Sequence, residues 1–521
     1  MIIGVGILFL LVSKYFMSEM PPPPVPYLHM RPILLGLVFL LSLASARTAM
    51  ADAQRYLFLD PAILQKTENV QIRINPPEQR EMVIRPDKPW EQLMISFFLT
   101  VLDEDGKLRM WYACRDKDQT NPTSDANLAY AESTDGVNWT KPNLGLIDYH
   151  GSTENNLVGV PSLEGNVYQD PQAASPAEKY IYVTYQKKEG VIRYTSPDGL
   201  RWKKDGTPLM NFKADTQNVT FWDANIEKYV VYLRGWTVDE QVWQNKRRQI
   251  VRLTSESLSK PLPVVPVTKR GPGVSPLITT ELPVVLAVDS EDEENSDIYN
   301  ISAEPYPLDR RWYIGFPSIL KRERSVSDGT VKIHFVGSKD GLTWHKYDRT
   351  PYVELKPKNT ETPNMAFMGT GVVVRGDEIW QYGTEFFSRH GDIKAREKRT
   401  DGAIYRYVQR IDGFVSLDFD AEEGSARTEP LEVTGDQLLL NMKSEAGGSL
   451  RVGLLKADGS AIPGFGLGDC LPLEKDSTSE VVSWKGGSLG SLGDEKIQIV
   501  FAGRHSKLYS FRFASRRDLN Q

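Results

Sequence analysis

Acidic side chains stand at the starts or ends of several short apolar or aromatic runs, a placement that suits acid–base chemistry. A carboxyl group there can hold or release a proton, while neighbouring amides, aromatic rings and guanidinium groups can bind a polar ligand. The acidic candidates are Glu91, Asp170, Asp215, Asp297 and Glu385. The candidate binding residues around them are Trp90, Arg115, Gln217, Asn218, Arg234, Tyr299 and His390.

Two stretches, PDKPWE and ADTQNVTFWD, carry the strongest functional signal. In the first, Trp90 beside Glu91 could form a flat platform for a sugar ring and keep water away from the acid. In the second, Asp215, Gln217 and Asn218 cluster at the start of a predicted strand, where folding alone requires none of them.

The other candidates have structural interpretations of equal standing. Asp170 precedes a proline and can cap a turn, and Asp297 follows the run DSEDEENSD, which is typical of a solvated loop. Glu385 ends an aromatic strand and could face either a ligand or solvent. Arg115 and Arg234 could orient a substrate or a carboxylate through the guanidinium fork, or form ordinary surface ion pairs.

A short repeat indicates which elements position these residues. The pattern S-x-D-G-x-x-W begins at Ser133, Ser196 and Ser338. Asp-Gly between strands predicts a tight hairpin, because glycine accepts the positive φ that such turns need. The spacing between the second and third copies is about twice that between the first and second. The stretch RLTSESLSKP, which lies between the second and third copies, keeps only the serine of the motif. We interpret the motif as structural, with its tryptophan packed between neighbouring units.

An aromatic-rich strand precedes each hairpin, intact or degenerate, which makes five units in all. These strands begin at Lys107, Lys179, Lys228, Arg311 and Glu378. Radially repeated groups of four antiparallel strands are propeller blades. We therefore predict an all-β fold with a five-bladed β-propeller over residues 53–418. Short alternating strands and glycine-rich turns over 419–521 predict a small C-terminal β-sandwich.

The net charge, the cysteine count and the N-terminal segment limit the possible partners and the cellular compartment. A net charge of −6 over 521 residues leaves no basic surface for nucleic acid. The two cysteines, Cys114 and Cys470, fall in different predicted domains, so no disulfide is expected. Residues 1–52 read as a leader whose signal peptide ends at Ala49-Met50-Ala51, which predicts a secreted or periplasmic protein.

The start of this leader has two interpretations. Met30 can be the true start, with residues 1–29 an extension, or the apolar run at Ile2–Val12 can be a retained anchor. We favour the first, and expect no stable membrane insertion after signal cleavage, because eleven apolar residues are too few to cross a bilayer.

The predicted propeller and sandwich resemble the glycoside hydrolases of family 32, and the propeller alone resembles those of family 43. The stretches DTQNVTFWD, QRIDGFVSLD and the run from IPGF to DC are most similar to a group of bacterial secreted proteins of uncharacterised activity. The resemblance implies an axial funnel in which carboxylates at the starts of the innermost strands cleave a glycosidic bond. The nucleophile and acid motifs typical of family 32 are absent.

This resemblance implies a carbohydrate substrate, with Glu91 as the acid, Asp215 as the base or nucleophile, and Asp297 as a third carboxylate. The alternative is a propeller that binds carbohydrate without cleaving it. A sialidase-type enzyme is disfavoured, because its repeated turn has an extra residue between Asp and Gly. We expect no cofactor and no metal, since the histidines are scattered and no Cys/His cluster occurs. The oligomeric state is open.

Overall fold

The computed structural model describes residues 54–117, 127–161, 164–186, 189–211, 213–237, 246–262, 282–358, 361–392, 394–395, 399–493 and 495–515. They belong to one compact unit, Ala51–Asn520. The predicted leader lies outside the described residues. Within the described ranges, no helix is long and apolar enough to cross a membrane.

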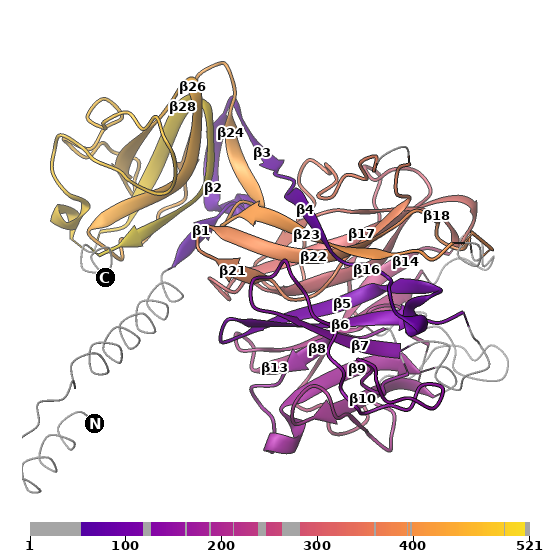
Figure 1. Ribbon diagram of the computed structural model, residues 1–521. Helices are drawn as coiled ribbons and strands as arrows, with labels where there is room; N and C mark the ends of the chain where they lie inside the picture. The colour runs from indigo at the N-terminus through magenta and orange to yellow at the C-terminus, as the bar shows by residue number, and fades with distance from the viewer. Residues whose placement is uncertain are drawn as a thin grey trace, which may run out of the picture. The chain divides into compact units, whose positions relative to one another are not determined.

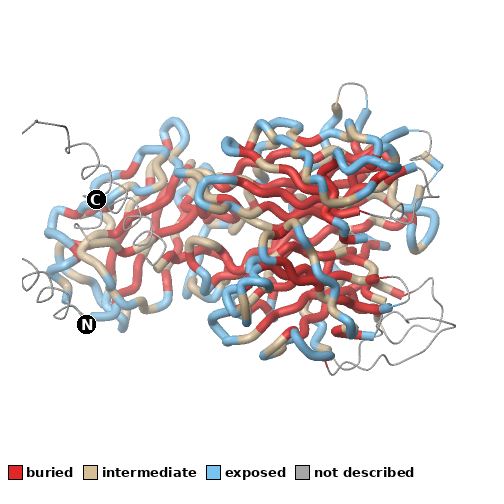
Figure 2. Tube along the Cα trace, turned by 60° about the horizontal axis from the view of Figure 1, so that its bottom comes forward, coloured by how far each residue is buried: buried red, intermediate tan, exposed pale blue. Residues whose placement is uncertain are grey.

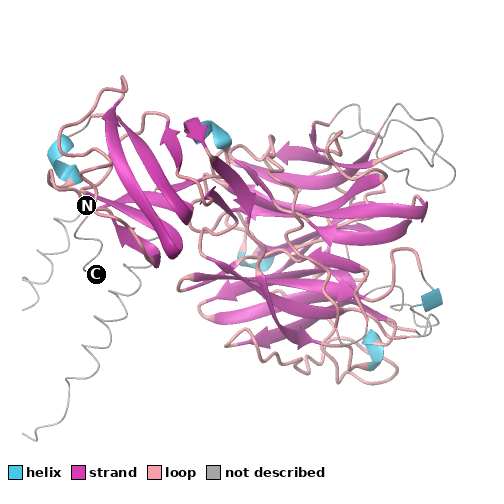
Figure 3. Ribbon diagram, turned by 90° about the horizontal axis from the view of Figure 1, so that it is seen from above, coloured by secondary structure: helices cyan, strands magenta, loops and turns pink. Residues whose placement is uncertain are grey.

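Strands dominate, and the all-β class predicted from the sequence is confirmed (Figure 3). The helices are single 3-10 turns, among them η1 (Pro61–Ile63), η2 (Pro89–Glu91), η3 (Pro176–Glu178) and η5 (Leu489–Leu492). Figure 2 shows that the strands are buried along most of their length and that the exposed residues gather in the connections. The site must therefore be built from strand ends and loops.

Three antiparallel groups follow one another along the chain (Figure 1). The first contains β5 (Met94–Glu104), β6 (Lys107–Arg115) and β7 (Asn127–Ser133). The second contains β8 (Val167–Gln169), β9 (Tyr180–Gln186), β10 (Gly190–Ser196) and β11 (Lys203–Lys204). The third contains β12 (Val219–Asp223), β13 (Lys228–Trp236), β14 (Arg248–Ser255) and β15 (Val284–Leu286).

Two further groups share one nine-stranded sheet. The fourth contains β16 (Ser296–Pro305), β17 (Tyr313–Ser325), β18 (Asp328–Ile333) and β19 (Val336–Ser338). The fifth contains β20 (Met365–Met368), β21 (Val373–Arg375), β22 (Glu378–Phe386) and β23 (Ala403–Arg410). The N-terminal strand β4 (Glu78–Ile84) pairs with β23, so the fifth group joins both ends of the series.

The first strands of the five groups contact one another in a closed circuit. The hydrogen bonds that link consecutive groups join Thr100 to Val167, Asn166 to Thr220, Gln217 to Asn300, Ser302 to Gly369, and Thr370 to Thr100. Such a circuit is the arrangement of strands around a propeller axis. The number of blades itself stays a prediction.

Each of the three intact copies of the repeated hairpin fastens its group to the preceding one around the circuit. In the second group, Ser196 Oγ accepts a hydrogen bond from the Gly199 amide at 2.9 Å, and Gly199 has φ +74°. The Gly199 carbonyl in turn accepts a 2.6 Å hydrogen bond from Trp111 Nε1 of the first group. Tyr382 and Tyr232 donate in the same way to Gly136 and Gly341. The motif is structural, and an aromatic donor from the preceding group completes it.

The C-terminal strands and the N-terminal segment together form a further sheet of eight strands. Its members are β1 (Arg55–Leu57), β2 (Leu64–Glu68), β3 (Val70–Ile74), β24 (Val415–Phe419), β25 (Gly424–Thr428), β26 (Gln437–Lys456), β27 (Asp476–Val481) and β28 (Ile497–Ala514). The sequence assigned 53–74 to the propeller, but β1, β2 and β3 pair with β28, β25 and β24. The domain boundaries otherwise stay predictions.

We expect Gly199→Ala to lower the free energy of unfolding by about 2 kcal/mol or more, because the new Cβ would strain the positive φ and crowd Trp111. A Cβ built there lies 2.6 Å from Trp111 Cζ2. Gly206→Ala is the matched control, since Gly206 lies near the same hairpin with nothing within 4 Å of its Cβ position. Denaturant unfolding measures both, and equal stabilities would contradict the proposed fastening.

Candidate functional site

Two carboxyl groups come together where β8 and β12 begin. Glu164 precedes β8 and Asp215 precedes β12, and a parallel bridge between Gly165 and Asn218 aligns the two starts. The Asn218 backbone amide and its Nδ2 both donate to the Glu164 carbonyl, at 2.8 and 2.6 Å. Asn218, a predicted binding residue, is therefore buried and positions the backbone that carries Glu164.

Glu164 has the environment of a proton donor. Burial raises the pKa of its carboxyl well above the usual range, and nearby Asp215 raises it further, whereas Arg234, Arg115 and Lys213 act in the opposite direction. The residue is partly exposed, but its Oε2 is buried with no hydrogen-bond partner among the described residues. A protonated acid beside an ionised partner can give its proton to a ligand.

Asp215 is held by two cations. Its Oδ1 lies 3.0 Å from Arg234 Nη1 and its Oδ2 lies 2.8 Å from Lys213 Nζ. One third of the Asp215 side chain is exposed, at 33%, whereas only 3% of the Arg234 side chain is. The structure therefore brings the two predicted residues Asp215 and Arg234 into contact, and the Asp215 carboxylate stays partly exposed.

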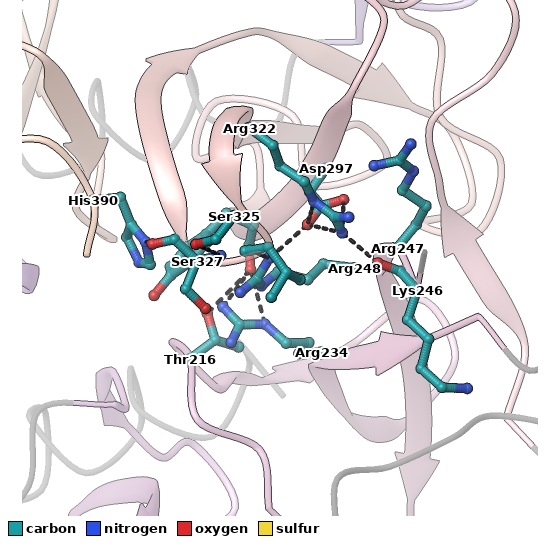
Figure 4. Close-up of polar contacts among 12 residues, drawn as sticks. Thr216, Arg234, Lys246, Arg247, Arg248, Asp297, Arg322, Ser325, Ser327 and His390 are labelled. Carbon is teal, nitrogen blue, oxygen red and sulfur yellow. Dashed lines mark hydrogen bonds and ion pairs between the residues drawn. The ribbon is translucent and has the colours of Figure 1, made fainter. Parts of the chain in front are cut away.

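Tyr299 connects Arg234 to Arg248, and Figure 4 shows these two arginines with Asp297 and Arg322 nearby. The Tyr299 carbonyl accepts hydrogen bonds from Arg234 Nη2 at 2.8 Å and Nε at 3.2 Å. The Arg234 guanidinium also lies 4.3 Å from the centroid of the Tyr299 ring, and that of Arg248 lies 5.5 Å away. The His390 ring packs edge-on against Tyr299 at 4.7 Å, and its Nδ1 lies 2.6 Å from the Ser327 carbonyl.

Asp297, predicted as a third catalytic carboxylate, has a different role. It is fully buried, at 0% exposure. Its carboxylate accepts a 2.6 Å hydrogen bond from Arg248 Nη1 and two from Arg322, at 2.6 and 3.0 Å (Figure 4). A carboxylate enclosed by two guanidinium groups cannot reach a ligand. Asp297 is a positioning residue that neutralises and orients Arg248.

Gln217 faces the propeller axis, and one of its side-chain polar atoms has no hydrogen-bond partner among the described residues. Its Oε1 accepts a hydrogen bond from Asn300 Nδ2 at 3.3 Å, but its Nε2 is buried and has no partner within the described part of the chain. Asn218 Oδ1 and Asn300 Oδ1 are likewise buried without a hydrogen-bond partner among the described residues. Buried polar atoms from β16 and from the start of β12 are thus available to water or to a ligand on the axis.

Arg115, at the end of β6, belongs to the same electrostatic group, since its charge acts on Glu164. It is partly exposed, and its Nε is buried without a hydrogen-bond partner in the described residues. The predicted role in orienting a charged group therefore remains open to it.

Trp90 and Glu91 lie elsewhere, and here the sequence-based assignment is wrong. Glu91 is 0% exposed and its carboxylate is fully engaged by Tyr112 Oη at 2.6 Å, by Lys141 Nζ at 2.7 Å and by two backbone amides. Trp90 is buried and donates to Asn156 Oδ1 at 2.9 Å. These contacts anchor η2 against β6, so neither an acid nor a sugar platform is exposed here.

Asp170 and Glu385 are also structural. Asp170 follows β8, where it caps the next turn through the Gln172 amide and accepts a 2.8 Å hydrogen bond from Tyr229 Oη. Glu385 is 3% exposed, lies 2.9 Å from Lys358 Nζ and accepts a 2.6 Å hydrogen bond from Tyr407 Oη. Neither has a contact in the described structure with the residues around Tyr299.

Glu164 was missed by sequence reasoning, although a signal for it exists. It stands three residues before β8, much as Asp215 stands four residues before β12. In both positions a polar stretch precedes a short apolar strand, LEGNVY and ADTQNVTF.

Metal chemistry has no visible ligand set in the described ranges, where no group of three or more His, Cys, Asp or Glu side chains could hold an ion. Asp215 and Asp297 are paired with arginine and lysine side chains.

Comparisons with known proteins were made for the sequence and for the fold. No family model and no curated protein sequence matches the chain. A thermostable family-43 glycoside hydrolase is 13% identical over 62% of this chain and 92% of that one, with a TM-score of 0.39. A family-43 arabinoxylan arabinofuranohydrolase from Bacillus subtilis, in complex with cellotetraose, is 11% identical over 82% and 96%, at 0.36.

A third structure belongs to the GH130 family, described as mannoside phosphorylases that include hydrolases of β-1,2 mannosidic linkages in Candida mannan. It is 13% identical over 65% of this chain and 94% of that one, with a TM-score of 0.40. These likenesses are too weak to carry an argument about activity, which must come from the site itself.

We expect Asp297→Ala to lower the free energy of unfolding by about 3–5 kcal/mol, because it leaves Arg248 and Arg322 buried without their counter-ion. Glu189→Ala is the matched control, since Glu189 pairs with Lys204 at an exposed position and should matter by about 1 kcal/mol or less. Denaturant unfolding gives both values. A loss for Asp297→Ala no larger than for the control would refute the positioning role.

The raised pKa of Glu164 also predicts how stability depends on pH. Because the folded state holds this proton more tightly than the unfolded chain, the contribution is fully present below the unfolded pKa and is lost as pH rises through the folded pKa. Glu164→Gln cannot ionise, so we expect it to be more stable than the unsubstituted protein at neutral pH. The gain should disappear near pH ~4. A gain that is independent of pH would contradict the assignment.

Proposed function

We propose that the protein hydrolyses a glycosidic bond, with Glu164 as the general acid and Asp215 as the second carboxylate. The observation that carries this proposal is the pairing of a carboxyl whose pKa is raised by burial with an ion-paired, partly exposed carboxylate on the adjacent strand start. Glycosidases need such a pair, one member protonated and the other ionised.

In the proposed reaction, Glu164 donates its proton to the oxygen of the leaving sugar as the bond from that oxygen to the anomeric carbon breaks. Asp215 either removes a proton from the attacking water or attacks the anomeric carbon itself, in which case water later releases the sugar. Arg234 and Lys213 contact the two oxygens of Asp215 and hold its direction.

The substrate proposed is a polysaccharide or oligosaccharide, encountered outside the cytoplasm if the leader acts as a signal peptide. The partly exposed ring of His390 is the aromatic surface at this site, since the Tyr299 ring that it packs against is buried. Gln217 Nε2 has no hydrogen-bond partner among the described residues. Sugar sites commonly combine such rings with a few polar groups.

A propeller that binds carbohydrate without cleaving it is the second candidate. One observation favours it: both oxygens of Asp215 already carry a cation, which lowers the ability of a carboxylate to act as a base or nucleophile. In that case the same carboxyl groups would be hydrogen-bond partners of the sugar.

We expect Glu164→Gln and Asp215→Asn each to lower kcat/KM for sugar release by about 10²-fold or more. The assay is release from a panel of polysaccharides and aryl glycosides. Activity of the unsubstituted protein should fall as pH rises through the raised pKa of Glu164, because the acid must be protonated. With aryl glycosides that carry a good leaving group, Glu164→Gln should lose much less activity, since departure then needs little acid assistance.

Glu304→Gln is the matched control. Burial raises the pKa of Glu304 to about 7, but Glu304 stands at the far end of β16 and binds the Gly371 amide. Equal losses in this control and in Glu164→Gln would show that burial of a carboxyl, and not the site, is responsible. Binding without turnover in any variant would favour the second candidate.

A further inference from the structure

Among the described residues of the site, cationic side chains outnumber carboxyl groups. The cations are Arg115, Lys213, Arg234, Arg248 and Arg322, and the carboxyl groups are Glu164, Asp215 and Asp297. Because burial favours the protonated form of Glu164, its negative charge is reduced further. The strand starts therefore present an excess of positive charge, although the whole chain has a net charge of −6.

Two of these guanidinium groups are crowded against one ring. Arg234 and Arg248 lie 4.3 and 5.5 Å from the Tyr299 centroid. Burial lowers the pKa of Arg248, and the charge of Arg234 lowers it further. Asp297, the counter-ion of Arg248, is shared with Arg322. Asp297 thus contacts two buried guanidinium groups at once.

Hydrogen-bond donors are left over as well. Arg248 is 4% exposed, and its Nε is buried with no partner among the described residues. Arg115 Nε is in the same condition, and Arg115 forms no ion pair with another described residue. Unpartnered buried Nε atoms also occur in Arg55 and Arg252, which form ion pairs elsewhere in the fold. What distinguishes Arg115 and Arg248 is their position, since one acts on Glu164 and the other packs against Tyr299.

We propose that the saccharide bound at this site carries an anionic group, a ring carboxylate or a sulfate ester, and that Arg115 and Arg248 bind it. The inference rests on the proposed function for the saccharide and on the charge balance for the anion. A guanidinium fork pairs with either group through two parallel hydrogen bonds. A neutral sugar would leave the excess charge and the free Nε donors uncompensated.

The test is binding of the full-length protein to matched pairs of oligosaccharides by calorimetry. One pair is an oligouronate and its carboxyl-reduced form, and the other is a sulfated galactan oligosaccharide and its desulfated form. We expect one charged probe to bind at least about tenfold more tightly than its neutral partner, as one charge-assisted contact allows. The pair that shows the difference identifies the carboxylate or the sulfate as the group recognised.

Arg115→Gln should lower the affinity for the charged probe by about tenfold or more and leave the neutral partner unchanged. Arg248→Lys, which keeps the charge near Asp297 but loses the fork, should do the same without unfolding the protein. The control is Arg201→Gln, since Arg201 is 68% exposed and pairs only with Asp198 of its own hairpin. Equal binding of both members of each pair, or no binding of either charged probe, would overturn the inference.

The two proposals can fail separately. Cleavage of neutral substrates that depends on Glu164, without preference for charge, would preserve the proposed hydrolase and refute the anionic ligand. Charge-dependent binding that is sensitive to Arg115, without any cleavage, would preserve the anionic ligand and refute the proposed hydrolase.

Discussion

The contact between first strands around the axis is the constraint on which the rest of the structure depends. The five antiparallel groups close the circuit through hydrogen-bonded side chains between their first strands, among them Thr100, Thr370 and Ser302. The candidate carboxyl groups lie at the strand starts. Glu164 and Asp215 lie at such a start, joined by the amide of Asn218.

The elements and their order could be predicted from sequence because they depend on local signals. Asp-Gly turns, aromatic runs and alternation identified the hairpins, and the repeat identified the units. The pairing of β1, β2 and β3 with C-terminal strands could not be predicted, because partners over 300 residues apart leave no local pattern. Judged from the sequence alone, the apolar residues of these strands could pack against either sheet.

The site was predictable only in part, for a reason of geometry. Asp215, Arg234, Tyr299 and His390 were named from the sequence and lie near one another. Glu91 was named for the tryptophan beside it, but that tryptophan is buried and the acid completes an ion pair with Lys141. The residues around an acid in the sequence do not reveal which direction its side chain takes. That direction decides whether burial raises the pKa of the acid at a ligand site or whether the acid only forms an ion pair with a lysine.

The N-terminal strands have a consequence for how the chain is made. Arg55 on β1 is in register with Arg512 on β28, and β4 completes the sheet that ends in β23. During synthesis the N-terminal strands therefore wait for partners that are translated much later. The nine-stranded sheet can close once β23, which ends at Arg410, has emerged, whereas the eight-stranded sheet needs β28, which ends at Ala514. β1 must therefore stay accessible to chaperones or to a translocation channel until synthesis is nearly finished.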